Sequence, residues 1–573
     1  MAPQFAQFVA NVAEKLDGFT GRDKGMAAAA DEPPASSLEY GLIEERPRSS
    51  SGSAVSFGGS FKVVMLMAAS VGAVLCVPLF LSSSAFTSLG STASQTEWHG
   101  VSLGGWLLME VNPAKRTADD AMDLRPFWMF DQFEAPSELD FITQLRQEHG
   151  DAYAITTMQN HWDRYISDTQ LDEAQKLGIN AVRIPVGYWI MDSPAAGSGK
   201  GGAFKGSPLE YGISPEGFVT GGLNHLRSML IKLKQRKMVA LVDVHSLPCN
   251  SGCISDGMSC KAPLAFGNPD GTPAAIADMP RCYGGFYKTT RTASASESSW
   301  GDVGVNSVAA LAAWLAALPD EAQSVCAFQL ANEPALGPPG IYDDAVAEFY
   351  ARAHAKVRSH LPSTPLIFSF MGPSPSAIKL LKESNSKASV TAEKGGAGLP
   401  AEVLADHHYY LNWQSPVGED LPWDEIHRRA CVREAEGAAH AVDFYAENSL
   451  PLIVGEWSLA VNHDIKHDLT DKKVVENLSK LFKEQVYAFT TLPEIRGHFF
   501  WTLRMGSGWD PRPSDGYPKG KQLEGTSAWK SLEEYPFAVW SLLEMAAVGV
   551  AANFKGNYAE LCESAFKLDA AGQ

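Results

Sequence analysis

The sequence predicts a (β/α)8 barrel, in which eight parallel strands alternate with helices around a closed sheet. From about residue 98, short apolar runs of strand length alternate with stretches of helical periodicity. Eight such strand-then-helix units follow in succession, which is the pattern of a closed parallel barrel. Polar side chains also recur where the apolar runs end, and barrels of this kind carry their chemistry at the carboxyl ends of their strands.

The individual elements follow from these patterns. The expected strands are 100–108, 181–186, 239–245, 325–332, 365–370, 403–410, 452–457 and 495–502. The clearest expected helices are 168–177, 223–237, 306–318, 343–361 and 472–489, with a last one at 532–550. A doubly wound open sheet is the alternative. No glycine-rich phosphate loop follows the first strand, however, where Gly104-Gly105 is a weak signal by itself.

The composition is normal for a globular protein with an excess of acidic residues, and it fits a soluble enzyme that acts on a neutral or cationic ligand. The chain has 573 residues, of which 45% are apolar and 20% are charged. Its 47 basic and 66 acidic residues give a formal net charge of −19. Because contact with nucleic-acid phosphates needs a basic face, this balance argues against a nucleic-acid partner.

The first 97 residues differ in composition from the rest. Residues 1–61 are rich in Ala, Ser, Gly and Pro, which predicts a disordered tail. Residues 62–84 contain an uncharged apolar run, 63–81, which is just long enough to span a bilayer as a helix. A buried core helix is the alternative. A Ser/Thr-rich linker, 85–97, then leads to the predicted catalytic domain, 98–573.

The orientation of this predicted transmembrane helix follows from the charges beside it. Arg46, Arg48 and Lys62 precede the apolar run, and no positive charge follows it closely. Positive flanks stay on the cytosolic side, so we expect a single-pass type II membrane protein whose tail is cytosolic. The apolar run begins too far from residue 1 for a cleaved signal peptide. The catalytic domain would then be extracellular or lumenal.

Four of the eight cysteines are clustered in one loop-like segment. They are Cys249, Cys253, Cys260 and Cys282. In a reducing compartment such a cluster could bind zinc, although it lacks a C-x2-C pair and a histidine at zinc-finger spacing. In an oxidising compartment the same cluster indicates one or two disulfides. The predicted orientation in the membrane favours disulfides, whose connectivity stays open.

Two glutamates carry the strongest functional signal. Glu333 lies in FQLANEP (328–334) and Glu456 in LIVGEWS (452–458), and each ends an apolar run that is typical of a buried strand. Two carboxylates from different strands are what the hydrolysis of a glycosidic bond requires. One must be protonated to donate to the leaving oxygen, and the other must be ionised to attack the anomeric carbon. The alternative is a pair of buried structural acids that are bound to arginines.

Further polar and aromatic residues at the strand ends fit the same chemistry. Arg183 would favour the ionised nucleophile, and Tyr410 could donate a hydrogen bond to it. Asn332 is placed to bind a sugar 2-hydroxyl, a contact that strengthens in the transition state. The other candidates are His245 and His408, which could orient hydroxyls or carboxylates, Trp501, which could lie under the sugar ring, and Glu110, which follows the first strand.

The chain resembles glycoside hydrolase family 5, most closely the fungal-type exo-β-1,3-glucanase branch. The resemblance covers roughly residues 98–570, and its combination of motifs is highly specific. The matching segments are HGVSLGGWLLME (99–110), HWDRYI (161–166), LGINAVRIPVGYWI (177–190), VDVH (242–245), LANEP (330–334), DHHYY (406–410), VGEWS (454–458) and FFWT (499–502).

The resemblance implies a role for each matched residue. It makes Glu333 the acid/base and Glu456 the nucleophile of a retaining double displacement, whose carboxyl groups lie about 5–5.5 Å apart. Glu110 matches a residue that binds the sugar at the non-reducing end, and Trp413 matches an aromatic residue that helps to clamp the sugar. The other matched residues are Arg183, His245, Asn332, His408, Tyr410 and Trp501. The resemblance also suggests that Cys431 and Cys562 pair, and it implies neither a metal nor an organic cofactor.

The loops that would face the substrate depart from the family pattern. Val111-Asn112 replaces the familiar Pro-aromatic pair, a cysteine-rich insertion follows His245, and the last strand continues as RMGSGW (504–509). The second aromatic of the clamp is not evident.

We predict a membrane-anchored, monomeric hydrolase of β-1,3-glucan that can also transfer glucosyl units to sugars. The alternatives are a hydrolase of another β-glucoside (β-1,6-glucan, β-1,4-glucan or a glycolipid) and a non-catalytic glucan-binding protein. A metal-dependent hydrolase would use Asp406-His407-His408, assisted by Asp243 and His245, and would leave the glutamates unexplained. The sequon at Asn477 predicts N-glycosylation on a surface helix.

Overall fold

The computed structural model describes most of the chain after residue 96. The described residues are 97–110, 130, 133, 135, 138–192, 218–247, 300–334, 341–370, 375–393, 402–412, 420–433, 441–461, 468–506, 509–514, 516, 518, 519, 521, 522 and 538–563. They all belong to one compact unit, Gly90–Gln573. The predicted tail, transmembrane helix and linker lie outside the described residues, apart from Glu97.

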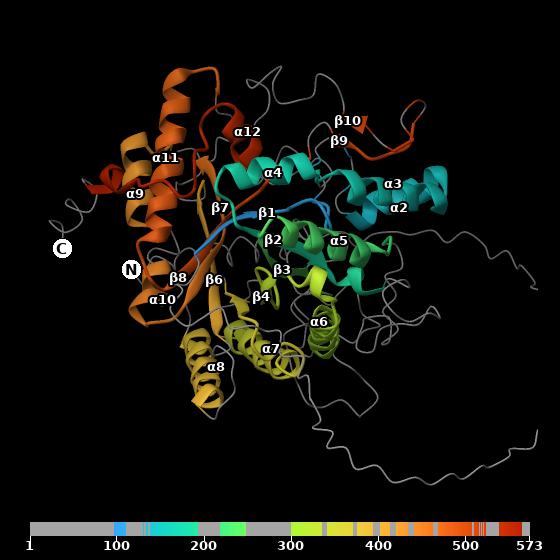
Figure 1. The fold of residues 1–573 in the computed structure, drawn as a ribbon, viewed down its shortest axis with the longest axis horizontal. Helices are drawn as coiled ribbons and strands as arrows, with labels where there is room; N and C mark the ends of the chain where they lie inside the picture. The colour runs from blue at the N-terminus through green and yellow to red at the C-terminus, as the bar shows by residue number, and fades with distance from the viewer. Residues whose placement is uncertain are drawn as a thin grey trace, which may run out of the picture. The chain divides into compact units, whose positions relative to one another are not determined.

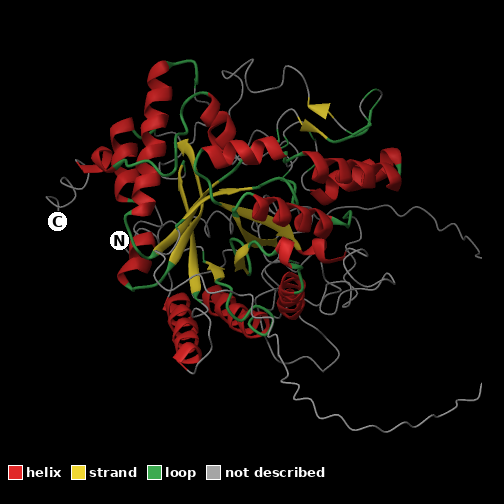
Figure 2. Ribbon diagram, in the orientation of Figure 1, coloured by secondary structure: helices red, strands yellow, loops and turns green. Residues whose placement is uncertain are grey.

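The described residues contain a closed barrel of eight parallel strands (Figures 1 and 2). The strands are β1 (Trp98–Ser102), β2 (Ala181–Gly187), β3 (Val239–Ser246), β4 (Val325–Gln329), β5 (Leu366–Ser369), β6 (Val403–Leu411), β7 (Leu452–Val461) and β8 (Ile495–Phe500). Each strand pairs with the next along the chain, and β8 pairs with β1 to close the sheet. This closure confirms the predicted barrel and excludes the open doubly wound sheet.

Helices follow the strands and cover the outside of the barrel (Figure 2). They are α2 (Glu138–His149), α3 (Asp151–Arg164), α4 (Asp168–Lys176), α5 (Gly222–Gln235), α6 (Trp300–Ala316), α7 (Ile341–Val357), α8 (Pro375–Glu393), α9 (Trp423–Val432), α10 (Ala441–Glu447), α11 (Lys472–Thr490) and α12 (Leu542–Ala547). A small antiparallel pair, β9 (Trp509–Asp510) and β10 (Lys521–Gln522), follows β8.

The inside of the barrel is filled by one apolar residue from each of β2 to β8. They are Ala181, Leu241, Ala327, Ile367, Leu404, Ile453 and Phe499, and all are fully buried. On β1 the corresponding space is left open by Gly100, where an added Cβ atom would lie 2.1 Å from the Phe499 ring. A glycine is therefore needed at this position, because the large ring of Phe499 fills the volume beside β1.

Two predicted strands end earlier than their apolar runs. The predicted strand 100–108 ends at Ser102 in the structure, and Gly105 has a positive φ of 72° that turns the chain. The predicted strand 325–332 ends at Gln329 in the structure, so Asn332 and Glu333 lie in the turn after β4. Both segments stay buried without being strands, and a pattern of apolar residues does not distinguish these two situations.

The helices differ from the prediction at the carboxyl end. The predicted helix 532–550 is represented by α12, a much shorter helix, which ends before Gly549 with its positive φ of 78°. Helices α2, α3, α8, α9 and α10 were not among the clearest helical patterns of the sequence. None of the helices in the described part of the chain is long and apolar enough to cross a membrane.

A disulfide joins the end of α9 to the carboxyl-terminal segment. Cys431 and Cys562 are bonded across 131 residues of chain, as the family resemblance suggested. Both are buried, and they pack with Val432 in a small separate apolar cluster. The four clustered cysteines that follow β3 in the sequence lie outside the described residues. The disulfides expected among them therefore stay a prediction.

We expect the double variant Cys431→Ala/Cys562→Ala to be less stable by roughly 2–5 kcal/mol, because the crosslink restricts a long loop in the unfolded chain. Equilibrium unfolding in urea, followed by tryptophan fluorescence, measures this difference. A transition midpoint equal to that of the wild type would contradict the prediction. Retained activity in the folded variant would show that the crosslink acts on stability and not on the site.

Candidate active site

A fully buried arginine lies at the centre of the polar cluster at the carboxyl ends of the strands. Arg183 of β2 donates from Nη1 to Oε1 of Glu456 at 2.7 Å and from Nη2 to Oδ1 of Asn332 at 2.7 Å. Its Nη2 atom also lies 3.0 Å from Oδ2 of Asp243, and Nε donates to Gln329. One guanidinium thus fixes side chains from β3, β4, β7 and the turn after β4.

The charge of Arg183 is retained despite its burial. Burial lowers the pKa of the guanidinium, but the carboxylates of Asp243, Glu456 and Asp406 outweigh this effect and raise it overall. An unpaired buried charge would strongly destabilise the fold. These acidic partners are therefore required for a charged arginine to be buried at this position.

Glu456 is held by donors on both of its oxygens. Oε1 accepts from Arg183, and Oε2 accepts from the Tyr410 hydroxyl at 2.7 Å. Glu456 lies within β7, whose ten residues are all buried, and its own side chain is 7% exposed. Two donors in fixed positions hold the carboxylate in one orientation. A nucleophile needs such an orientation because it must attack along a defined line.

Glu333 lies opposite, in the turn after β4, and is far more open to solvent. Its side chain is 34% exposed, and its backbone has a φ of +30°, which is rare for residues other than glycine. His408 of β6 lies between the two glutamates, with Nδ1 at 2.5 Å from Oε1 of Glu333 and 3.4 Å from Oε2 of Glu456. Ligand atoms of all three residues lie within 4.8 Å of one another.

The charges around His408 and Glu333 favour a proton on the histidine over a proton on the glutamate. Burial would lower the pKa of His408, but the charges of Glu456, Asp406 and Glu333 raise it well above its ordinary value. Burial would raise the pKa of Glu333, but His408 lowers it overall. The protonated glutamate expected from the sequence stays a prediction. His408, which is hydrogen-bonded to Glu333, is the neighbouring group that can supply the proton.

Buried Asp406 makes further hydrogen bonds that hold His408, Gln329 and β7 in place. Asp406 Oδ2 accepts from Gln329 Nε2 at 2.8 Å and contacts Nε2 of His408 at 3.1 Å, while Oδ1 accepts from the backbone N–H of Gly455 at 2.9 Å. A Cβ atom on Gly455 would lie 2.1 Å from Asp406 Oδ1. The glycine before Glu456 is therefore what allows Asp406 to reach the backbone of β7.

His245 and Trp501 extend the site toward Glu110. His245 Nδ1 is 2.7 Å from Asp243, and its Nε2 is 3.3 Å from the Asn332 amide and 3.9 Å from Glu110. The Trp501 ring stacks on His245 with centroids 5.6 Å apart and planes 9° apart. Trp501, which is joined to Thr502 by a cis peptide bond, is 4% exposed.

The structure therefore brings nine of the ten predicted site residues into one connected group. They are Glu110, Arg183, His245, Asn332, Glu333, His408, Tyr410, Glu456 and Trp501. The tenth, Trp413, lies outside the described residues. Gln329, which joins Arg183 to Asp406, was not among the residues predicted from the sequence. A polar residue inside the apolar run of β4 was the signal that could have revealed it.

Two groups of described residues could supply the ligands of a metal ion. The first is Glu333, His408 and Glu456, but Arg183 and Tyr410 already donate to both oxygens of Glu456. This arrangement suits acid–base and nucleophilic chemistry better than it suits a cation. The second group is at the other end of the barrel, in β1 and β8. Of the set predicted for a metal hydrolase, His407 makes no hydrogen bond through Nε2 within the described part of the chain.

Comparison with known proteins identifies the family. Residues 147–488, more than half of the chain, match the family described as Cellulase (glycosyl hydrolase family 5). The chain belongs to glycoside hydrolase family 5. It is accordingly a glycoside hydrolase with the β-glycosidase function of that family, as the motifs predicted.

Curated relatives of this family 5 enzyme come from fungi. It is 23% identical over 383 residues to Glucan endo-1,6-beta-glucosidase B of Emericella nidulans, covering 65% of this chain and 74% of the relative. It is 23% identical over 372 residues to Probable glucan 1,3-beta-glucosidase A of Aspergillus fumigatus, covering 64% and 66%. Among solved structures, rutinosidase from Aspergillus niger matches 72% of this chain and 92% of that chain, with 15% identity and a TM-score of 0.43.

Replacing His408 should move the basic limb of the pH–rate profile to lower pH. In the wild type the pair of His408 and Glu333 keeps its proton up to the raised pKa of the histidine. In His408→Asn the proton would lie on the Glu333 carboxyl, which loses it at lower pH. We expect kcat/KM on an aryl β-glucoside to fall by about tenfold or more at the wild-type optimum.

Profiles of kcat/KM against pH for His408→Asn and the wild type measure this shift. His360→Asn, at an exposed position, is the control and should reproduce the wild-type profile. An unchanged basic limb in His408→Asn would mean that the histidine does not share the catalytic proton.

Proposed function

We propose that this enzyme hydrolyses β-glucosidic bonds with retention of configuration, and that β-1,3-glucan, cleaved from its non-reducing end, is its substrate. The single observation that carries the retaining mechanism is the close approach of Glu333 and Glu456, whose carboxyl oxygens and the His408 ring nitrogen lie within 4.8 Å of one another. Retaining enzymes hold their carboxyl groups about 5–5.5 Å apart, whereas inverting enzymes need roughly 6.5–9.5 Å to admit a water molecule.

In the first step Glu456 attacks the anomeric carbon and forms a glycosyl ester. The bond from that carbon to the leaving oxygen breaks, and Glu333 gives the leaving oxygen a proton, which it draws from His408. Arg183 and Tyr410 hold Glu456 in line. In the second step Glu333 takes a proton from water, the water oxygen attacks the anomeric carbon, and the ester bond to Glu456 breaks.

The same intermediate explains the proposed transfer activity. A sugar hydroxyl can replace water in the second step without any change in the protein groups, and a new glycosidic bond then forms. Negative charge on Glu456 disappears when the ester forms, and that charge is one of the causes that raise the pKa of His408. His408, which supplied its proton in the first step, then has a lower affinity for a proton, so it stays neutral and Glu333 can act as the base.

The proposed linkage rests on the family resemblance and on the relatives. Glu110 is 2% exposed and lies at the end of the chain of contacts through His245. In that position it could bind the hydroxyls of a terminal sugar. The relatives include enzymes named for β-1,6 and for β-1,3 linkages at the same identity, so β-1,6-glucan is the second candidate substrate.

Time-resolved proton NMR of the full chain with laminarin, a β-1,3-glucan, tests this proposal. We expect β-glucose to appear first, and its formation to fall by roughly a thousandfold or more in Glu456→Gln, which lacks the nucleophile. The variant His149→Asn, at an exposed position at the end of α2, is the control and should match the wild type. Early α-glucose would contradict the retaining mechanism. Early β-configured oligosaccharides would contradict cleavage from the chain end, and activity on β-1,6-glucan alone would contradict the linkage.

We also propose that residues 63–81 anchor the enzyme in a membrane with the catalytic domain outside the cytosol. The proposal rests on the uncharged run and on the basic residues before it. In microsomes, added protease should digest the tail but leave residues 98–573 protected, and Asn477 of α11 should carry an N-glycan. Extraction of the intact chain by alkaline carbonate, without detergent, would contradict an integral anchor.

A further inference from the structure

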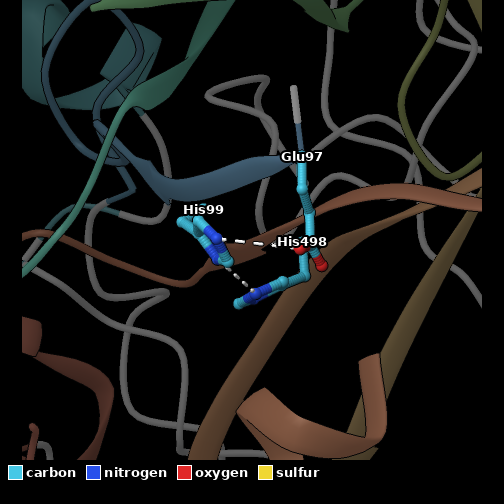
Figure 3. Close-up of side chains that lie close together, drawn as sticks. All are labelled: Glu97, His99 and His498. Carbon is cyan, nitrogen blue, oxygen red and sulfur yellow. Dashed lines mark hydrogen bonds and ion pairs between the residues drawn. The ribbon is translucent and has the colours of Figure 1, made fainter. Parts of the chain in front are cut away.

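A polar cluster on the outside of the barrel lies at the end opposite to the catalytic group. It consists of Glu97 and His99, at the start of β1, and His498 of β8, and we call it the seam cluster (Figure 3). These residues come from the two strands that close the barrel, where His99 and His498 are paired in register. Ligand atoms from the three residues lie within 4.8 Å of one another.

We propose that the seam cluster is a binding site for a zinc ion, with His99 and His498 as nitrogen ligands and Glu97 as the carboxylate ligand. A site of two histidines, one carboxylate and one water is a common zinc coordination set. The following observations support this assignment.

The geometry of the strands places the ligands on one face. Side chains alternate across a strand, so Glu97 and His99 point to the same side of β1. Trp98, between them, packs with the apolar residues inside the barrel, so the two ligands point outward. His498 also points outward, because its neighbour Phe499 fills the interior. Two residues at i and i+2 and their cross-strand neighbour therefore face one another without any rearrangement of the backbone.

The distance between the two imidazoles already suits a shared ion. His99 Nδ1 and His498 Nε2 are 3.3 Å apart. Two nitrogens that bind one tetrahedral zinc ion at about 2.0–2.1 Å would be roughly 3.3 Å apart. Glu97 Oε2 lies 3.8 Å from His99 Nε2, and its side chain is 33% exposed, so it can rotate toward the ion while water reaches the open side.

A charged neighbour of the cluster is Lys555, which interacts electrostatically with His99. Its side chain is exposed, so it can turn away from a bound ion.

Apart from His99, the surroundings of His498 are aromatic rings. Its ring stacks on Phe554 and also contacts Trp457 and Phe489. Nδ1 is buried and accepts or donates no hydrogen bond within the described part of the chain. An apolar side chain would cost less to bury among these rings, since a buried ring nitrogen without a partner destabilises the fold. The other ring nitrogen, Nε2, faces His99 at 3.3 Å, so the polar function of this buried ring lies at the seam cluster.

The backbone beneath the ligands is fixed in advance. The side chain of Asn180, just before β2, accepts from the backbone N–H of His99 at 2.9 Å and donates to the carbonyl of Glu97 at 2.9 Å. Both ligands on β1 are thus held by one side chain, so ion binding needs to order only the Glu97 side chain. Zinc here would connect the first strand of the barrel to the last one.

Zinc titration of the full chain, freed of metal with a chelator, tests the assignment. We expect His99→Asn and Glu97→Gln to bind one equivalent of Zn2+ fewer than the wild type, as measured by calorimetry and by metal content after gel filtration. Zn2+ should raise the melting temperature of the wild type by several degrees and that of His99→Asn by much less. Co2+ should give the visible absorption of a tetrahedral complex in the wild type and lose this signal in His99→Asn.

Matched variants separate this site from others that could bind zinc. His149→Asn removes a histidine that lies 3.7 Å from Glu148 in an exposed pair without a second histidine, and it should bind as the wild type does. Glu456→Gln alters the catalytic group and should keep the equivalent that His99→Asn loses. Hydrolytic activity in His99→Asn, at the wild-type level without added metal, would show that this variant is folded.

Lys555→Ala should bind zinc roughly threefold to tenfold more tightly, because it removes a nearby positive charge. Weaker binding in this variant would place the ion elsewhere and overturn the assignment. Equal uptake of Zn2+ by the wild type and by folded His99→Asn would overturn it as well, as would a metal-free wild type that takes up no Zn2+.

Discussion

The buried charge of Arg183 is the constraint on which the catalytic end of the barrel depends. A guanidinium with no exposed surface is tolerated only if acids and amides surround it, and Glu456, Asp243, Asn332 and Gln329 all make contact with it. Removal of the arginine would leave Asp243 and Glu456 buried beside each other without their common partner. The same interaction thus orients the nucleophile, the amide beside the acid/base and the carboxylate that holds His245.

The two glutamates of the site lie in different environments. Glu456 lies inside a fully buried strand between two donors, whereas Glu333 lies on a turn, is open to solvent and meets the protonated His408. A nucleophile gains from a rigid and charged state, while an acid/base group must exchange protons in both directions. The pKa of His408, which lies between them, depends on the charges of both glutamates. The charge of the nucleophile therefore affects how strongly His408 binds its proton.

The two ends of the barrel use the same elements for different purposes. At the carboxyl ends the polar side chains point toward the place where a substrate would bind, and their hydrogen bonds form a continuous network. At the opposite end His498 packs against aromatic residues of α11 and of the carboxyl-terminal segment, and His99 lies beside it. One buried hydrogen bond joins the two histidines, and this sparse pairing is what distinguishes the seam cluster from a structural network.

The sequence by itself determined the barrel, because the strands are largely buried on both faces and so appear as mostly apolar runs, several of which contain or end in polar residues. It also determined the two glutamates, since a carboxylate at the end of such a run is costly without a function. The limits of β1 and β4 required the tertiary structure, because the buried segments after Ser102 and Gln329 are apolar without being strands. Gln329 was missed for a related reason: its partners Arg183 and Asp406 are far away along the chain. His99 and His498, 399 residues apart, become neighbours only when β8 pairs with β1, and no local pattern in the sequence records that contact.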